Sequence, residues 1–224
     1  MKNIEILYED NFSIVVNKPA GLAVQGGKGV NSSLDKILAQ MRAPAPLLVH
    51  RLDKDTSGVL LAAKGREEAA LFSRLLGGVQ NAAGGGKKAV KKYTAVCLGH
   101  PAKKEGTIRE DLMIKGIMKK SETRYRVIKS GKLDIPACGD VEFSVLELEL
   151  GTGRMHQIRR HLAMNGNPIL GDDKYGDFSL NKKLRKTAGL KRLLLHASRL
   201  VIKNDKINID AAAPLPEYFS PFTS

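Results

Sequence analysis

Short runs in which apolar and polar residues alternate dominate the chain, as expected for β-strands that bury one face. Residues 4–8 and 12–17 form two such runs, and the turn residues Glu9-Asp10-Asn11 between them predict a hairpin. Further strands are predicted at residues 93–98, 107–114, 124–128, 141–150, 193–202 and 207–209. Strands therefore form most of the expected fold.

Helices are predicted at residues 34–41, 66–76, 155–165 and 179–187. The first follows the capping residues Asn31-Ser32-Ser33 and ends before Pro44, and the second is followed by Gly77 and Gly78, which stop helices. Because strands outnumber helices and several strands are joined by short turns, we expect an α+β fold with a largely antiparallel sheet. A single domain over residues 1–224 is the simplest arrangement at this length.

Charge is the unusual part of the composition. The chain has 37 Lys and Arg against 23 Asp and Glu, a net charge of +14, and nearly all of the excess lies after residue 86. A basic surface attracts polyanions such as RNA, although a merely soluble basic protein or a protein that binds anionic membranes would share this composition.

Cysteine usage and the hydrophobic runs indicate a cytoplasmic protein. Cys97 and Cys138 are too few and too far apart for a disulfide framework or a Cys-based metal site, which suits a reducing cytosol. The first residues lack the basic and apolar regions of a secretory signal, and no run of eighteen apolar residues occurs. We therefore expect no membrane partner.

The nonapeptide His50–Gly58, with the sequence HRLDKDTSG, is the most informative segment. It lies between the apolar runs 47–49 and 59–63, so its charged groups stand where the chain leaves and re-enters the core. By itself it could be a structural turn, because Asp and Ser side chains bond to nearby backbone and Gly accepts positive φ. A polar loop held by rigid strands is equally a common place for functional residues.

This nonapeptide resembles the signature loop of the RluA-type pseudouridine synthases, enzymes that isomerise uridine in RNA to pseudouridine. Five further segments match that family in the same order, namely Asn17–Leu22, Lys91–Val96, Gly153–Leu162, Asn167–Asp172 with Tyr175–Gly176, and Leu194–Ala197. Met155 and Arg160 depart from the family pattern, and residues 77–92 are richer in Gly than expected, which predicts mobility there. With matches from residue 17 to residue 197, the chain is identified as a member of the family.

The resemblance implies a fold and a set of active-site roles. The fold is a mixed, largely antiparallel sheet flanked by helices, with a cleft across its middle. Asp53 would be the catalytic carboxylate, Arg159 its ion-pair partner, and Tyr93 would pack against the target base and take part in proton transfer. Arg51 would replace the flipped uridine in the RNA helix, and Leu195 would line the uracil pocket. Without the resemblance these are ordinary core or surface residues.

Several further expectations follow. The isomerisation needs no cofactor and no energy input, and Asp55 reads as a neighbour that stabilises the turn. Two groups of basic residues are candidate phosphate contacts, namely Lys87, Lys88, Lys91 and Lys92, and Lys182, Lys183, Arg185 and Lys186. The substrate would be large-subunit ribosomal RNA, transfer RNA or both, and the protein a monomer. No small RNA-binding domain is expected ahead of the catalytic domain, because the first family strand begins near residue 4.

Other chemistries fit less well. His156 and His161 are five residues apart with no Glu between them, so the zinc-protease arrangement fails. Asp172 and Asp173 could suggest a carboxylate pair, but adjacent residues on an extended segment point to opposite faces. The alternative function is a noncatalytic RNA-binding or ribosome-assembly protein on the same fold, and the joint presence of Asp53, Tyr93 and Arg159 argues against it.

Overall fold

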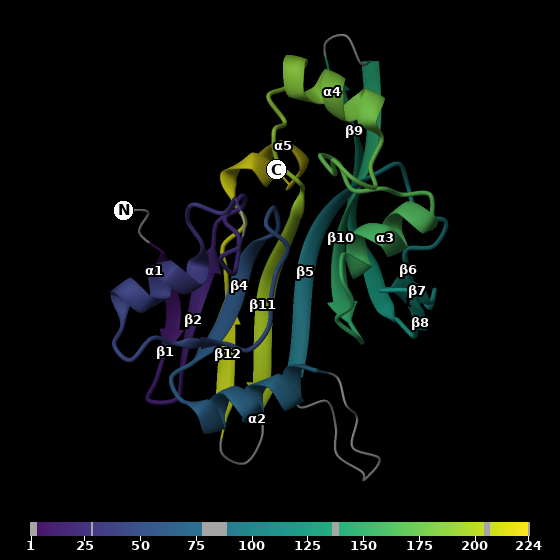
Figure 1. The fold of residues 1–224 in the computed structure, drawn as a ribbon. Coiled ribbons are helices and arrows are strands. Elements are labelled where there is room, and N and C mark those ends of the chain that lie inside the picture. Colours follow the sequence, from purple (N-terminus) through teal and green to yellow (C-terminus); the bar gives the residue numbers. More distant parts are fainter. Residues whose placement is uncertain (1–3, 28, 78–88, 136–138, 204–206, 224) are drawn as a thin grey trace. The chain divides into compact units, whose positions relative to one another are not determined.

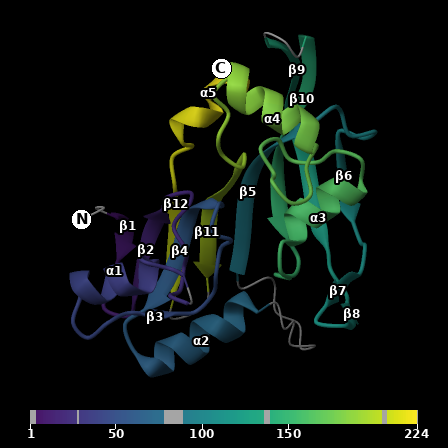
Figure 2. The same ribbon diagram turned by 45° about the horizontal axis from the view of Figure 1, so that its top comes forward.

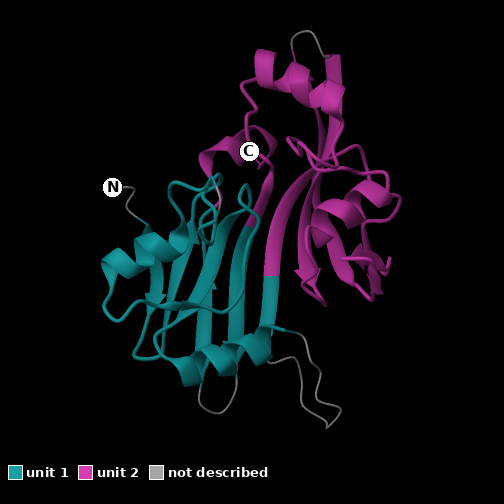
Figure 3. Ribbon diagram, viewed as in Figure 1, with its two compact units in different colours: residues 1–91, 197–214 teal, residues 92–196, 215–224 magenta. Residues whose placement is uncertain are grey.

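The computed structural model describes residues 4–27, 29–77, 89–135, 139–203 and 207–223. Its chain divides into two compact units, of which unit 1 is residues 1–91 and 197–214, and unit 2 is residues 92–196 and 215–224 (Figure 3). Most of the Gly-rich segment 77–92, for which mobility is predicted, lies outside the described ranges. Lys87, Lys88 and Cys138 also lie outside them.

Unit 1 contains a sheet with the strand order β1-β2-β4-β11, to which β3 adds by pairing with β4 and β12 by pairing with β11 (Figure 1). The strands are β1 Glu5–Glu9, β2 Ser13–Lys18, β3 Leu47–Leu48, β4 Ser57–Ala63, β11 Leu195–Lys203 and β12 Asn208–Ala212. The predicted hairpin is confirmed, since β1 and β2 pair antiparallel. The carboxylate of Asp10 closes their turn by accepting hydrogen bonds from the backbone amides of Phe12 and Ser13.

The core of unit 1 forms around β4, in which every residue is buried. Helix α2, Arg66–Leu76, has the predicted bounds and buries Phe72 and Leu76 against one set of alternate β4 side chains, which includes Val59 and Leu61 (Figure 2). Helix α1, Leu34–Met41, begins after Ser33 as its capping residues predict. Burial on both faces makes β4 a rigid support for the nonapeptide that precedes it.

The sheet of unit 2 has the strand order β5-β10-β9-β6, and a separate hairpin is formed by β7 and β8. The strands are β5 Ala89–Leu98, β6 Glu105–Ile108, β7 Leu112–Ile114, β8 Ile117–Lys119, β9 Thr123–Ile135 and β10 Gly139–Leu150. The single strand predicted at 107–114 is wrong, because the chain leaves the sheet after Ile108. The pairings of β10 with β5 and β9 are antiparallel, and the α+β prediction is confirmed.

Helices α3, Gln157–Met164, and α4, Phe178–Thr187, belong to unit 2. The first begins two residues later than predicted, because His156 has the left-handed backbone angles φ 54° and ψ 28° and cannot continue a right-handed helix. A 3₁₀ turn at Glu217–Phe219 and the short α5 at Ser220–Thr223 lie outside every predicted element. In the described part of the chain, no helix has the length and apolar character needed to cross a membrane.

Candidate active site

The nonapeptide forms the connection between β3 and β4 in unit 1. Leu52 is buried, whereas Arg51 on one side of it is exposed and Asp53 on the other is half-buried. The chain then turns, and the amide of Thr56 donates to the carbonyl oxygen of Asp53 at 3.2 Å. Burial of Leu52 therefore anchors the loop and leaves the two predicted functional side chains accessible to a substrate.

A buried lysine stabilises this turn through hydrogen bonds to its backbone. The side chain of Lys18, at the end of β2, has 0% exposure, and its Nζ donates to the carbonyl oxygens of Pro19, Leu22 and Lys54 at 3.0, 2.9 and 3.0 Å. The carbonyl of Lys54 also accepts from the amide of Gly21 at 2.8 Å. The Lys-Pro-x-Gly turn and the nonapeptide are thus one hydrogen-bonded structure, although sequence reasoning gave Lys18 no role.

The pKa of Lys18 depends on its burial and on the nearby carboxylates of the turn. Burial lowers the pKa of Lys18 to about 8, and the negative charges of Asp55 and Asp53 act in the opposite direction. Lys18 therefore places a positive charge near the two carboxylates of this turn.

Both ends of the nonapeptide are held by the core. His50 accepts a hydrogen bond at Nε2 from the amide of Leu61 at 3.0 Å, and burial, assisted by the charge of Lys91, lowers its pKa to about 4, so the ring is neutral at pH 7. At the other end Gly58 has φ 108°, and a Cβ there would lie 2.1 Å from the carbonyl oxygen of Ala197. Only glycine fits this position.

In unit 2, two motif side chains attach α3 to β9. The buried Gln157 donates from Nε2 to the carbonyl of Glu122 at 2.8 Å and to Oγ1 of Thr123 at 3.0 Å. The ring of His161, also buried, shares hydrogen bonds with Thr123 Oγ1 and with the carbonyl of Glu110, both at 2.9 Å. These contacts fix the helix that carries Arg159, which makes His161 a structural residue.

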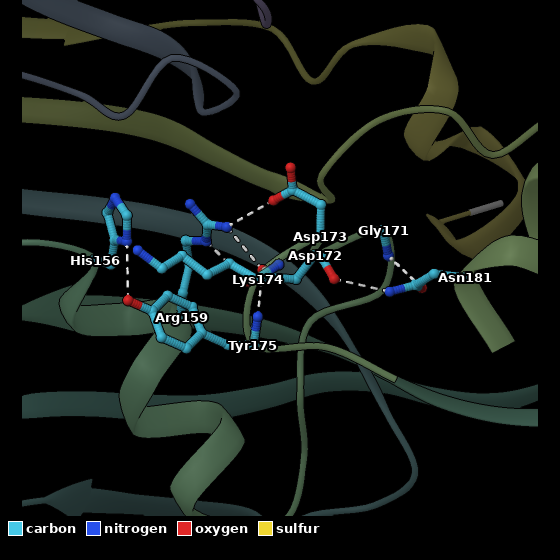
Figure 4. A network of polar contacts seen from close by, with 8 residues as sticks. All are labelled: His156, Arg159, Gly171, Asp172, Asp173, Lys174, Tyr175 and Asn181. Atoms are coloured by element: carbon cyan, nitrogen blue, oxygen red, sulfur yellow. Dashed lines mark hydrogen bonds and ion pairs between the residues drawn. The ribbon is translucent and has the colours of Figure 1, made fainter. Parts of the chain in front are cut away.

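Arg159 is held by a buried bidentate ion pair (Figure 4). Its Nε and Nη2 donate to Asp172 at 2.8 and 2.7 Å, and Nη2 also donates to Asp173 at 3.1 Å. Arg159 and Asp172 are 5% and 1% exposed, whereas Asp173 is 71% exposed. The expectation that the two adjacent carboxylates diverge is wrong, because residues 172–175 form a turn rather than an extended segment.

The Asp172 carboxylate has further partners. Its Oδ1 accepts from the backbone amides of Lys174 and Tyr175, both at 2.9 Å. Burial would raise its pKa, but the hydrogen bonds from Arg159 and from these two amides outweigh burial and hold the pKa of Asp172 below its usual value. The guanidinium is therefore placed against a carboxylate that stays ionised at neutral pH.

An aromatic contact covers the same guanidinium. The Cζ atom of Arg159 lies 5.4 Å from the ring centroid of Tyr175, within cation–π range. The Tyr175 hydroxyl is 3.1 Å from Nδ1 of His156, whose left-handed backbone costs about 1–2 kcal/mol. Both residues lie in the matched motif segments, which is the signal that could have marked them.

Tyr93 and Leu195 are both buried in unit 2. Tyr93 lies on β5 opposite Leu148 of β10. Leu195 begins β11, and the preceding residue is fixed by backbone hydrogen bonds that join Leu194 to Leu170 and to Val96. Burial suits core residues as well as residues that line a pocket, so the roles predicted for both stay predictions.

Arg51 and Asp53 belong to unit 1, and Tyr93, Arg159 and Leu195 to unit 2. The pairing of Asp53 with Arg159 therefore also stays a prediction. Within the described residues, no group of three or more His, Cys, Asp or Glu side chains is arranged to hold a metal ion.

In unit 1, buried Lys18 thus fixes the turn that carries the half-buried carboxylate of Asp53. Comparison with known proteins defines the class. A family model described as RNA pseudouridylate synthase matches residues 12–164. A relative from Rickettsia felis named ribosomal large subunit pseudouridine synthase C is 38% identical over 227 residues, which cover 96% of this chain and 68% of the relative.

Solved structures agree with the sequence comparison. Human RNA pseudouridylate synthase domain containing 1 has a TM-score of 0.75 at 27% identity, over 99% of this chain and 87% of that protein. The corresponding human protein, domain containing 4, has a TM-score of 0.73 at 27% identity, over 97% and 90%. The chain belongs to the RNA pseudouridylate synthase family. It is an isomerase that acts on RNA and converts uridine to pseudouridine.

Proposed function

We propose that Asp53 is the catalytic carboxylate of this enzyme, that Arg159 pairs with it, and that Tyr93 packs against the reacting base. The observation that carries the proposal is the turn around Asp53, which buried Lys18 holds through the carbonyl of Lys54. A half-buried carboxylate on a fixed turn is pre-oriented for reaction with the substrate.

The reaction breaks the glycosidic carbon–nitrogen bond, turns the uracil and joins the sugar to a ring carbon. Asp53 acts beside the sugar as base or nucleophile, and Arg159 stabilises its negative charge. Tyr93 supplies a ring on which the detached base can pack and a hydroxyl for proton transfer. Leu195 lines the same pocket, and exposed Arg51 enters the RNA helix when the uridine is flipped.

For the substrate we propose large-subunit ribosomal RNA, since relatives of this chain are named ribosomal large subunit pseudouridine synthase C. The strongly basic composition suits a structured RNA target. We further propose that the enzyme works as a monomer in the cytoplasm. Mapping pseudouridines in total RNA from cells with and without the gene tests the substrate, because a position lost from transfer RNA instead would contradict it.

The catalytic assignment is tested by tritium release from RNA labelled at C5 of uridine. Asp53→Ala should reduce the rate by at least about 100-fold, since it removes the reacting group, while RNA affinity and melting temperature change little. Asp55→Ala is the matched control from the same turn and should keep most of the activity. Equal loss in both variants would show that the turn matters, and not the Asp53 carboxylate.

A further inference from the structure

Helix α4 presents an unusual concentration of positive charge. Its four exposed cations, here called the α4 cations, are Lys182, Lys183, Arg185 and Lys186. Among the described residues none of them forms an ion pair with an acidic side chain. Leu184 is the only buried residue of the helix, so nearly all of its surface faces solvent.

Several basic residues on the sheet of unit 2 are paired with acidic side chains. Arg124 of β9 lies 2.9 Å from Glu122 and 3.4 Å from Glu149, and Arg126 lies 3.2 Å from Glu147. The chain therefore places acidic partners beside the cations of its sheet but not beside those of α4. Unpaired Lys and Arg side chains on one helix repel one another, and that cost is recovered when a polyanion binds.

One side chain connects α4 to the arginine clamp. Asn181 donates from Nδ2 to the carbonyl of Asp172 and accepts at Oδ1 from the amide of Gly171, both at 2.9 Å (Figure 4). Space around this contact is closed, since a Cβ on Gly176 would lie 2.7 Å from Asn181 Nδ2. A displacement of α4 is therefore transmitted directly to the residue that holds Arg159.

We infer that α4 docks the phosphate backbone of the RNA substrate, and that Asn181 is a positioning residue which couples the docked helix to the Asp172–Arg159 pair. This inference rests on the proposed function. Phosphate oxygens are the natural partners of clustered, unpaired Lys and Arg side chains. The docked helix would then hold the guanidinium in place for catalysis on the RNA that it binds.

Docking is tested by changing all four α4 cations to Gln in the full-length enzyme. If each contacts one phosphate, affinity for the RNA transcript falls and the slope of log affinity against log salt decreases by about 3. The rate at saturating RNA should fall as well, on the order of 10-fold, because an undocked α4 no longer holds Asp172 and Arg159 in place. The control changes four exposed cations of unit 1 to Gln, namely Lys36, Arg66, Arg74 and Lys203.

Two results would overturn docking. The first is an α4 variant whose affinity and salt slope match those of the unit 1 control. The second is an α4 variant that binds RNA as the wild type does but has lost binding to phosphatidylserine vesicles, since the helix would then serve an anionic surface.

Coupling is tested with Asn181→Ala. The maximal rate should fall on the order of 10-fold, because Arg159 is held less precisely. The dissociation constant for RNA should stay within about twofold, because the α4 cations remain. A lower melting temperature with an unchanged maximal rate would show a merely structural role and contradict the coupling. Loss of all activity in Asp53→Ala beside normal behaviour of both α4 variants would keep the proposed function and reject this inference.

Discussion

Two buried cations, Lys18 in unit 1 and Arg159 in unit 2, are held in opposite ways. Lys18 is surrounded by three carbonyl oxygens, which carry no formal charge, whereas Arg159 is matched by a bidentate carboxylate. The two side chains also differ in whether the positive charge is permanent. Burial lowers the pKa of Lys18 to about 8, while an arginine next to an ionised Asp172 stays charged at any ordinary pH.

This contrast shows that the two buried cations have different tasks. Lys18 fixes the backbone conformation of two segments. Its Nζ donates to a carbonyl of the turn that carries Asp53 and to two carbonyls of residues 19–22. Arg159 keeps a charge in a defined orientation, because planar guanidinium and carboxylate groups fix each other.

The largest expected effect comes from breaking the pair in unit 2. Asp172→Ala removes the bidentate carboxylate from the buried guanidinium of Arg159, and the free energy of unfolding should fall by about 3–5 kcal/mol. Urea unfolding measures this loss. Adding Arg159→Met to this variant removes the buried charge and should restore part of the lost unfolding free energy. If Asp172→Ala alone lost less than about 1 kcal/mol, the carboxylate would not be needed to hold the buried cation, and Arg159 would not differ from Lys18 in this respect.

A pH dependence should come from Lys18. The folded protein binds this proton with a pKa of about 8 and the unfolded chain with the ordinary value of 10.5, so between these values only the unfolded chain holds it. Stability should therefore rise from about pH 8 to pH 10.5, by up to about 3 kcal/mol. The free energy of unfolding of the wild type should rise across this range relative to that of Lys18→Met, because the loss of stability above pH 9 from Cys97, whose pKa burial raises to about 12, is common to both proteins. The same slope in both would assign the effect to other groups.

The smallest effect is expected at the exposed carboxylate beside the clamp. Asp173 is 71% exposed, so its contact with Arg159 is screened by water. Asp173→Ala should change the free energy of unfolding by no more than about 1 kcal/mol, as measured by the same urea titration. A loss as large as that of Asp172→Ala would mean that the two carboxylates share the charge equally.

Local patterns predicted the elements of the fold well where one signal acted alone. Helix α2 has its predicted bounds because a clear apolar stripe is followed by Gly77. The predicted strand 107–114 was wrong because its sequence is β-like throughout, whereas long-range contacts decide its path. The carbonyl of Glu110 accepts hydrogen bonds from Ser121 and from His161. These long-range contacts fix residue 110 outside the sheet.

The candidate site was predictable as a set of motifs but not as a set of contacts. Resemblance marked Asp53 and Arg159, but it did not mark Asp172, which forms a buried bidentate ion pair with Arg159. That residue was set aside by assuming an extended backbone at a position where the chain turns. Lys18 was overlooked because a lysine is ordinarily a surface residue, and only the fold shows that it is enclosed.

Gly58 bears on how this enzyme could be redesigned. Because its missing side chain lets β4 approach the Ala197 backbone, the end of the nonapeptide cannot be varied without moving a strand. Libraries that aim at a new RNA target should therefore leave residues 52–58 constant. The varied positions should be exposed surface residues, where a substitution can change RNA recognition without changing the catalytic residues.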